Sequence, residues 1–287
     1  MTAVTIGLPV YNGAEFLEDA LASLCAQTFD DLRIVISDNA STDATPDIIA
    51  TWAARDSRIS AHRQPENIGM VPNFAWVLEQ ADSPWFMLAA HDDTWSPTFV
   101  EALYRAATAR PGCLLAVPQV IKTHPDGRED TRMPVPEALD QVDGLVRRRL
   151  LLRSVQSGWV YGLFDRRARL AAQEPTRRFG HTWGNEFITM LPMLLNGAVT
   201  GSNEAIYYQR QTGLSEDRYK PKTLAEQKAL YDDFLRQARF LLGEQPLSAF
   251  ERLVLHLELL RYTDSHAWKL RRLIRSSIKH AAALTRD

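Results

Sequence analysis

The chain has 287 residues, of which 45% are hydrophobic, 24% charged and 9% aromatic, proportions typical of an ordinary globular protein. Its 14 glycines and 15 prolines are too few for a collagen-like or disordered chain. The two cysteines, Cys25 and Cys113, lack the spacing of a disulfide scaffold or a zinc site, so we expect reduced thiols in a cytoplasmic protein. The sequence shows no signal peptide, and no run reaches the roughly 18 apolar residues that a membrane span requires.

The net charge of −2 conceals an asymmetry along the chain. Residues 1–100 contain 14 Asp and Glu against 4 Lys and Arg, whereas the remainder contains 21 against 29. An acidic region suits metal ions and sugar hydroxyls, and a basic region suits phosphates or an anionic membrane surface. The alternative is ordinary variation of surface charge.

The first 122 residues alternate short β-branched runs with segments of helical periodicity. The predicted strands are 4–8, 32–37, 59–63, 85–89 and 114–122. The predicted helices are 14–27, 45–55, 71–80 and 96–109, the last with Ser96 as its cap. This alternation predicts an α/β fold with a mostly parallel sheet covered by helices on both faces.

The second part of the chain is less regular. Residues 123–140 contain three prolines and many polar residues, so we expect a loop there. The further expected elements are a helix from 147, an extended segment at 159–164, a helix at 182–195, a strand at 205–209 and helices at 222–242, 246–264 and 266–284. We therefore expect a domain at 1–215, divided near residue 110, followed by a helical region at 216–287.

Polar residues follow four of the predicted strands. Ligands of open parallel sheets bind beyond the carboxyl ends of the strands, so these residues are the candidate site. They are Pro9, Tyr11 and Asn12 after the first strand, Asp38 after the second, Asn67 and Gly69 after the third, and His91, Asp92 and Asp93 after the fourth.

Three acidic positions could carry chemistry. Asp92 and Asp93 could bind Mg²⁺ or Mn²⁺ together with substrate phosphates, or they could cap the following helix. Asp38 could accept a hydrogen bond from a nucleobase whose ring stacks on Tyr11, or it could form an Asx-turn. Glu186 lies in an apolar neighbourhood that would raise its pKa toward that of a general base, although an isolated Glu is more often a surface helix residue.

Several other enzyme classes lack their motifs here. There is no GxGxxG after the first strand for a dinucleotide, no GxxxxGK[ST] for a P-loop, and no GxSxG for a serine hydrolase. A sugar-nucleotidyltransferase would need a Gly-rich basic loop in place of Pro9-Val10-Tyr11-Asn12. The seven histidines show no metal-ligand spacing.

Taken in order, these motifs resemble the family 2 glycosyltransferases of the GT-A fold. The resemblance rests on four segments, 5–12 (TIGLPVYN), 36–43 (ISDNASTD), 67–69 (NIG) with Asn73, and 91–93 (HDD) with Pro97. It is good over residues 2–110 and loose over 111–215, and it implies a nucleotide-binding half at 1–110 and an acceptor half at 111–215. It implies a Rossmann-like mostly parallel sheet and an inverting transferase that uses a nucleotide-sugar donor with Mg²⁺ or Mn²⁺.

The resemblance also implies roles for individual residues. The donor would be held by residues of the strand-end loops, namely Pro9, Tyr11, Asn12, Glu15, Asp38, Asn67, Gly69, Asn73, His91 and Asp92. Asp92 and Asp93 would belong to the motif that binds the metal and the donor, and Glu186 would be the catalytic base. The late segment Tyr208-Gln209-Arg210 resembles a strand that ends in Tyr-Arg in this family.

The sequence departs from the family pattern at three places. Ala90 replaces the usual acid two residues before Asp92, which leaves one carboxylate fewer for a metal and makes His91 the available substitute. Glu186 replaces the commoner Asp and has a longer reach. The His that often follows the late strand is absent, with Gln211 and Thr212 in its place. An inactive nucleotide-sugar-binding or scaffold protein of the same fold therefore stays an alternative.

The expected donor is a UDP-sugar, because an Asp beside a stacking Tyr suits the imide of uracil; thymine and guanine offer a similar N–H. The expected acceptor is a glycan or lipid-linked hydroxyl in polysaccharide biosynthesis. The basic, amphipathic segment 266–286 could dock on the core or contact an anionic membrane peripherally. Nucleic acid is not expected, since the basic residues are not interleaved with stacking aromatics. A homodimer is left open.

Overall fold

The computed structural model describes residues 2–212, 219–270 and 272–274. They form two compact units. The sheet unit comprises Met1–Glu137, Gly158–Ala171 and Ala198–Thr212, and the helical unit comprises Ala138–Ser157, Ala172–Gly197 and Gly213–Asp287. The division differs from the expected single boundary at 215, because residues 138–157 and 172–197 fold with the C-terminal helices.

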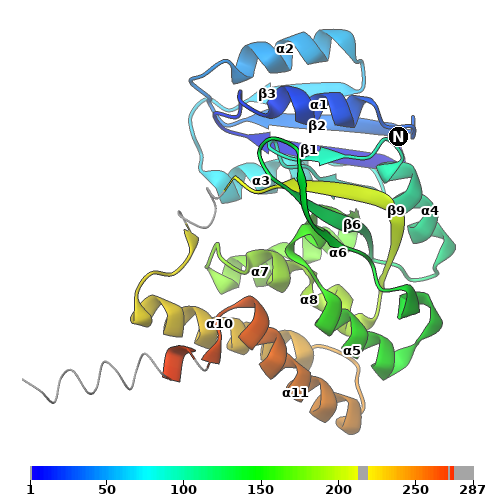
Figure 1. Ribbon diagram of the computed structural model, residues 1–287, viewed down its shortest axis with the longest axis vertical. Helices are drawn as coiled ribbons and strands as arrows, with labels where there is room; N and C mark the ends of the chain where they lie inside the picture. Colours follow the sequence, from blue (N-terminus) through cyan, green and yellow to red (C-terminus); the bar gives the residue numbers. More distant parts are fainter. Residues whose placement is uncertain (1, 213–218, 271, 275–287) are drawn as a thin grey trace, which may run out of the picture. The chain divides into compact units, whose positions relative to one another are not determined.

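Four parallel strands form the first part of the nine-stranded sheet, in the order β3-β2-β1-β4. Figure 1 shows β3, β2 and β1 side by side. They are β1 (Val4–Val10), β2 (Leu32–Asp38), β3 (Ile59–Arg63) and β4 (Trp85–Leu88). Every residue of β1 is buried, as expected of a central strand covered on both faces. These strands confirm the predictions made from the apolar runs, with ends that differ by one or two residues.

The connecting helices are α1 (Leu17–Cys25), α2 (Thr45–Arg55) and α3 (Met70–Glu79). The chain runs from β1 outward to β3 and then crosses to β4, so right-handed connections put α3 on the sheet face opposite α1 and α2. The helix predicted at 45–55 is confirmed, with Pro46 in its first turn. The first helix begins at Leu17 and not at 14, because the backbone N–H of Ala14 bonds to Asp43 of the next loop.

The second part of the sheet is mixed. It contains β5 (Thr94–Trp95), β6 (Leu115–Thr123), β7 (Glu129–Met133), β8 (Leu163–Asp165) and β9 (Val199–Arg210). Strand β8 joins the two parts, antiparallel to both β4 and β6, while β9 is parallel to β6 and antiparallel to β5. The sheet is therefore parallel only in its first part and mixed beyond β4.

Three expectations for local structure were wrong in detail. Residues 123–140 are not a plain loop, because β7 pairs with β6 and η1 (Glu137–Gln141) follows; the exposed, charged residues of β7 gave no alternating pattern. Residues 159–164 begin in η2 (Ser157–Tyr161) before β8.

Helix α4 (Phe99–Ala109) starts after 96, because Ser96 Oγ accepts the backbone N–H of Ile206 at the edge of β9. Helix α6 (Arg166–Ala171), which was not predicted, completes this unit.

The helical unit consists mainly of α5 (Gly144–Ser154), α7 (Gln173–Phe179), α8 (Asn185–Asn196), α10 (Leu224–Gly243) and α11 (Ala249–His266). Helix α8 packs against α5, α7 and α10, which explains why its apolar residues are buried almost all round. Capping boxes at Thr223 and Ser248 fix the starts of α10 and α11. The helix predicted at 266–284 falls largely outside the described residues. In the described part of the chain, no helix is both long and apolar enough to span a membrane.

The arginines of α5 belong to the packing of this unit. Arg147 is 1% exposed and its Nε donates to the carbonyl of Gly197 at 3.0 Å. Arg149 and Arg153 both donate from Nε to the buried carboxylate of Glu258 on α11, at 2.9 and 3.0 Å. Part of the excess positive charge of the second half is thus neutralised within the fold.

Candidate active site

The loops after β1 and β2 are joined by hydrogen bonds between backbone and side chains. Four bonds make the connection: Asn12 N to Ser41 Oγ (2.9 Å), Gly13 N to Thr45 Oγ1 (2.9 Å), Ala14 N to Asp43 Oδ2 (3.1 Å) and Thr42 N to Asn12 Oδ1 (2.8 Å). Asn12 has a φ of +50°, a left-handed conformation that asparagine tolerates. The two loops therefore form one rigid edge at the carboxyl end of the parallel strands.

The loop after β3 is attached to the same edge through amide side chains. Asn39 Nδ2 donates to Asn67 Oδ1 at 3.0 Å, and Asn39 Oδ1 accepts from Ile68 N at 2.9 Å. Gly69 then adopts a φ of +88°, which a side chain would strain, and α3 begins. Asn73 is buried, and both the oxygen and the nitrogen of its side-chain amide bond to Ser37. Asn73 therefore supports the loops of this edge from below.

Asp38 ends β2 with both carboxylate oxygens engaged. Oδ2 accepts from Arg63 Nη1 at 2.7 Å, and Oδ1 accepts from the backbone N–H of Ser41 at 3.0 Å. The bond to Ser41 spans three residues, whereas the Asx-turn that we regarded as the alternative for Asp38 would reach the second residue along the chain. In this loop that turn is formed by Asp43, whose Oδ1 accepts from Thr45 N at 3.0 Å. Arg63 was missed by the sequence analysis, although the parallel register of β2 and β3 pairs it with Asp38.

Tyr11 is the exposed aromatic residue of this edge. It is 42% exposed, two residues after the buried Pro9, and it directly follows the end of β1. Glu15 is exposed in the same loop. A buried acid beside an accessible aromatic ring is the arrangement that we expected for a nucleobase.

The loop after β4 lies against the loop after β1. A Cβ added to Gly13 would come within 2.5 Å of His91 Cδ2, so only glycine allows this approach. The strand ends of β1 and β4 are also where the strand order of the sheet reverses. The structure therefore brings the candidate residues of the loops after β1, β2, β3 and β4, from Pro9 to Asp93, to one edge of the sheet.

The two adjacent acids have different environments. Asp93 is 5% exposed; its Oδ1 accepts from Arg210 N at 2.7 Å and its Oδ2 accepts from the Tyr207 hydroxyl. Burial, together with the neighbouring charge of Asp92, raises the pKa of Asp93 to about 7. Asp92 is only partly buried, and its side chain makes no hydrogen bond to another described residue. Asp92 is therefore the accessible acid of the pair.

A cavity of about 210 Å³ adjoins Asp93. It is lined by Asp93, Thr94, Thr123, Gly127, Tyr208 and Arg210. The Arg210 guanidinium stacks on Phe16 at 4.5 Å and donates from Nη2 to Asp19 at 3.1 Å, while Nη1 is buried with no hydrogen-bond partner among the residues that the structure describes. An unsatisfied buried donor beside a cavity can bind an anionic group of a ligand.

The acidic motif fits a metal that is held jointly with a substrate. No three His, Cys, Asp or Glu side chains within the described ranges are grouped as a complete metal site. Mg²⁺ and Mn²⁺ need only one or two protein carboxylates when phosphates and waters supply the other ligands. Asp92 is the accessible candidate for this role, while each oxygen of Asp93 already accepts one hydrogen bond, from Tyr207 or from Arg210.

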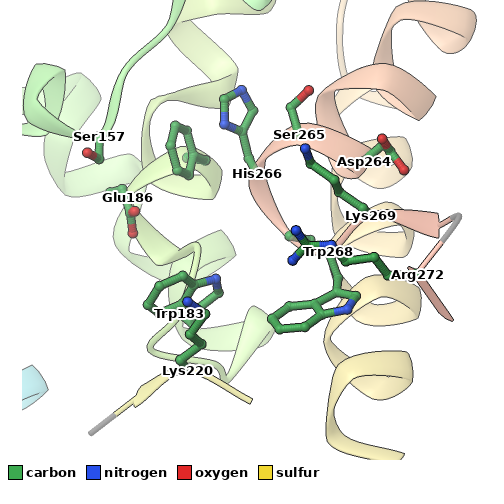
Figure 2. A pocket seen from close by; sticks show the side chains of 12 residues that line it. Ser157, Trp183, Glu186, Lys220, Asp264, Ser265, His266, Trp268, Lys269 and Arg272 are labelled. Atoms are coloured by element: carbon green, nitrogen blue, oxygen red, sulfur yellow. The ribbon is translucent and has the colours of Figure 1, made fainter. Parts of the chain in front are cut away.

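Glu186 lies in a pocket of about 310 Å³ within the helical unit (Figure 2). It is in the first turn of α8, after Gly184, whose φ of +81° ends the preceding turn. Its carboxylate makes no hydrogen bond to any other residue that the structure describes, and burial raises its pKa to about 7. The expectation of an acid with a raised pKa is confirmed, and its cause is desolvation.

Aromatic side chains form the floor around Glu186. His266 stacks on Phe187 with ring centroids 3.9 Å apart, and the Tyr262 hydroxyl donates to the Phe187 carbonyl at 2.9 Å. Burial lowers the pKa of His266 to about 4, so this imidazole is neutral at pH 7. Glu186 is thus the group of this pocket that can exchange a proton near neutral pH.

The family model for glycosyl transferase family 2 matches residues 5–172, more than half of the chain. The putative glycosyltransferase EpsH of Bacillus subtilis is 32% identical over 106 residues, which cover 37% of this chain and 30% of that protein. The putative teichuronic acid biosynthesis glycosyltransferase TuaG of the same organism is 30% identical over 98 residues, covering 34% of this chain and 39% of that protein. The chain therefore matches well under half the length of these relatives.

Solved structures share the fold. TarS 1–349 of S. aureus in complex with UDP-GlcNAc aligns with a TM-score of 0.67 at 16% identity, covering 93% of this chain and 74% of that chain. The mannosyltransferase PcManGT of Pyrobaculum calidifontis, in complex with GDP-Man and Mn²⁺, aligns with a TM-score of 0.51 at 15% identity, covering 99% and 81%. These likenesses confirm the expected α/β fold with flanking helices and a helical C-terminal region.

Proposed function

Because the chain belongs to glycosyl transferase family 2, we propose that it is an inverting glycosyltransferase that moves a sugar from a nucleotide donor to a glycan or lipid-linked hydroxyl. The observation that carries the proposal is the convergence of four strand-end loops, with accessible Tyr11 and Asp92, on one edge of the sheet. TarS was solved with UDP-GlcNAc and TuaG is named for teichuronic acid biosynthesis, which supports a UDP-sugar and a polysaccharide product.

The donor would bind at the edge formed by the loops after β1 to β4. Tyr11 would stack on the base, and Asp38 would accept its N–H while Arg63 holds the carboxylate in place. Asn12, Asn67 and Gly69 maintain the loops, and Pro9, Glu15 and His91 border them. Asn73 would act through its bonds to Ser37 and not by touching the donor.

The diphosphate would leave from the vicinity of Asp92 and Arg210. A bound Mg²⁺ or Mn²⁺, with Asp92 as its protein ligand, would neutralise charge on the leaving group. The unpaired Nη1 of Arg210 is a further donor for a phosphate oxygen. Asp93 would keep the end of β9 in place through Tyr207 and Arg210.

Glu186 would act as the general base. Its carboxylate takes the proton from an acceptor hydroxyl, whose oxygen forms a bond to the anomeric carbon as the bond to the nucleoside diphosphate breaks. Attack on the face opposite the leaving group inverts the anomeric configuration. A carboxylate with a pKa of about 7 is suited to accept a proton at neutral pH.

Peripheral contact with an anionic membrane on its cytoplasmic side is a further part of the proposal. Helix α11 exposes an apolar stripe of Phe250, Leu253, Leu257 and Leu260, 68%, 61%, 59% and 37% exposed. The basic segment 266–286 follows it, with 271 and 275–286 outside the described residues. We expect the protein to co-sediment with phosphatidylglycerol vesicles, and the double variant Leu253→Gln with Leu257→Gln to co-sediment less. If the stripe instead forms a homodimer, the molecular mass of the protein should rise with its concentration, and the double variant should abolish this rise.

A second candidate is an inactive nucleotide-sugar-binding protein of the same fold. It is favoured by one observation, that both oxygens of Asp93 are engaged and Ala90 supplies no third acid. Titration with UDP, dTDP, GDP and CDP, each with and without Mn²⁺, and a release assay for the nucleoside diphosphate distinguish the two. The transferase should bind one nucleotide more tightly with the metal and release it from the donor; binding without turnover would favour the second candidate.

A further inference from the structure

We propose that the pocket around Glu186 accepts a sugar that carries an acidic group, a phosphate or a carboxylate. This inference rests on the proposed function and specifies its acceptor. The pocket belongs entirely to the helical unit. Figure 2 shows Glu186, Trp183 and Lys220 on one side of it and His266, Trp268, Lys269 and Arg272 on the other.

The walls of the pocket suit a sugar ring. Trp183, Phe187 and Trp268 supply flat apolar surfaces, on which the C–H faces of a pyranose can stack. The volume of about 310 Å³ has room for one ring and a substituent. The Glu186 carboxylate is the acceptor for a hydroxyl proton of such a ring.

The cations of the pocket explain why the sugar should be acidic. Lys220 Nζ is 5.7 Å from the centre of the Trp183 ring. Lys269 and Arg272 are exposed on one helical turn, in which Arg272 N donates to Lys269 O at 2.8 Å. Neither of these two side chains forms an ion pair with a residue in the described ranges.

The acids of the pocket do not cancel this charge. The pocket lining contains three cations, Lys220, Lys269 and Arg272, against the two acids Asp264 and Glu186, and Glu186 is partly protonated at neutral pH. The contrast with α5 is informative, because Arg148, Arg149 and Arg153 all have a carboxylate partner on α11. Two basic side chains without a partner, at an aromatic pocket, are the arrangement that binds an anion on a sugar.

The test uses the full chain saturated with UDP and Mg²⁺, so that phosphate cannot report on the donor edge. Binding of glucose 1-phosphate, methyl glucuronide and methyl glucoside is followed by ligand-observed NMR. The variant Lys269→Gln with Arg272→Gln removes the charges at two exposed positions where unfolding is not at issue. Lys228→Gln is the matched control, an exposed lysine of the same unit that does not line the pocket.

We expect one or both acidic sugars to bind at least roughly 10-fold more tightly than methyl glucoside, with the tighter one identifying phosphate or carboxylate. The double variant should lose this preference, and Lys228→Gln should keep it. Trp268→Ala should weaken all three ligands. Equal binding of charged and neutral sugars, or an unchanged preference in the double variant, would overturn the inference.

The same samples separate this inference from the proposed function. UDP affinity, measured by calorimetry before the sugars are added, should be equal in the parent and the double variant. If UDP binds and the acidic preference is absent, the acceptor inference fails while the donor site stands. If UDP does not bind and acidic sugars do, the proposed transferase fails while the anionic sugar pocket stands.

Discussion

Two candidate regions of the molecule differ in how their polar side chains are bonded: the edge formed by the loops after β1 to β4, which we propose binds the donor (the donor edge), and the pocket of the helical unit around Glu186. At the edge, Asn12, Asp38 and Asn67 are held by hydrogen bonds, so the loops have a fixed shape before any ligand arrives. In the pocket, Glu186 has no hydrogen-bond partner within the described ranges, and its pKa is raised to about 7. A binding surface gains from satisfied polar groups, whereas a base gains from being left desolvated and unpaired.

The two regions also differ in the partners of their acids. Arg63 and the Ser41 N–H donate to the carboxylate of Asp38, whereas the carboxylate of Glu186 makes no hydrogen bond to another residue in the described ranges. Substitutions at the edge should therefore change donor affinity, and substitutions at Glu186 should change the rate and the stability. The predictions that follow test this division, from the largest expected effect to the smallest.

Glu186→Gln should reduce transfer by about 10³-fold, because the amide cannot accept a proton. Donor affinity should stay within a factor of two. The measurement is product formation at saturating donor, alongside calorimetry with UDP. Transfer at the parent rate would show that Glu186 is not the general base. Glu244→Gln is the control, because Glu244 is an exposed acid of the same unit that does not line the pocket.

Asp92→Asn should lower metal-dependent turnover by roughly 100-fold, a loss of about 2.7 kcal/mol of transition-state stabilisation. Additional Mn²⁺ should recover part of the activity, since the carboxylate is a metal ligand in the proposal. Asp93→Asn should instead reduce stability and activity without changing the metal requirement, since it would disturb Tyr207 and Arg210. Equal metal dependence in the two variants would contradict the distinction between the acids.

Glu186→Gln should also stabilise the protein at pH 8, by about 3 kcal/mol. The pKa of this carboxylate is about 7 in the folded chain against an ordinary 4.5, so the folded state holds more protons between these values. The carboxylate therefore destabilises the fold increasingly as the pH rises from 4.5 to 7, and fully above 7. Urea unfolding should show most of the gain at pH 8 and only a small part of it at pH 5; an equal gain at both would contradict the raised pKa.

Tyr11→Ala should raise the KM for the donor about 10-fold, in the range of one base stacked on one aromatic ring. Because Tyr11 is 42% exposed, the fold should not be affected. Tyr11→Phe keeps the ring and should bind the donor as the parent does. A Phe variant as weak as the Ala variant would show that the hydroxyl matters and that stacking is not the interaction.

Local sequence patterns were sufficient for the parallel part of the sheet. The apolar run at 32–37 and the helix at 45–55 each carry their own signal, so β2 and α2 could be predicted within a residue. Strand β7 could not, because Glu129–Met133 is an exposed edge strand without apolar alternation. It pairs with β6 as an antiparallel hairpin, and an exposed, charged edge strand carries no apolar periodicity from which that pairing could be predicted.

The candidate site divides in the same way. The position of strand ends predicted that Tyr11, Asp38 and Asp92 lie at one edge, since parallel strands end together. The partners of these residues could not be read from spacing: Arg63 reaches Asp38 from β3, and Tyr207 reaches Asp93 from β9. The different environments of the adjacent acids Asp92 and Asp93 follow from those contacts.

The most direct test of the account is calorimetric titration of UDP, with and without Mn²⁺, into the parent protein, Tyr11→Ala and Glu186→Gln. The account predicts that the parent binds UDP more tightly with Mn²⁺, that Tyr11→Ala weakens this binding about 10-fold, and that Glu186→Gln leaves it unchanged. Absence of UDP binding to the parent would contradict the donor edge as drawn. Equal weakening by both substitutions would contradict the division between a donor edge in the sheet unit and a base in the helical unit.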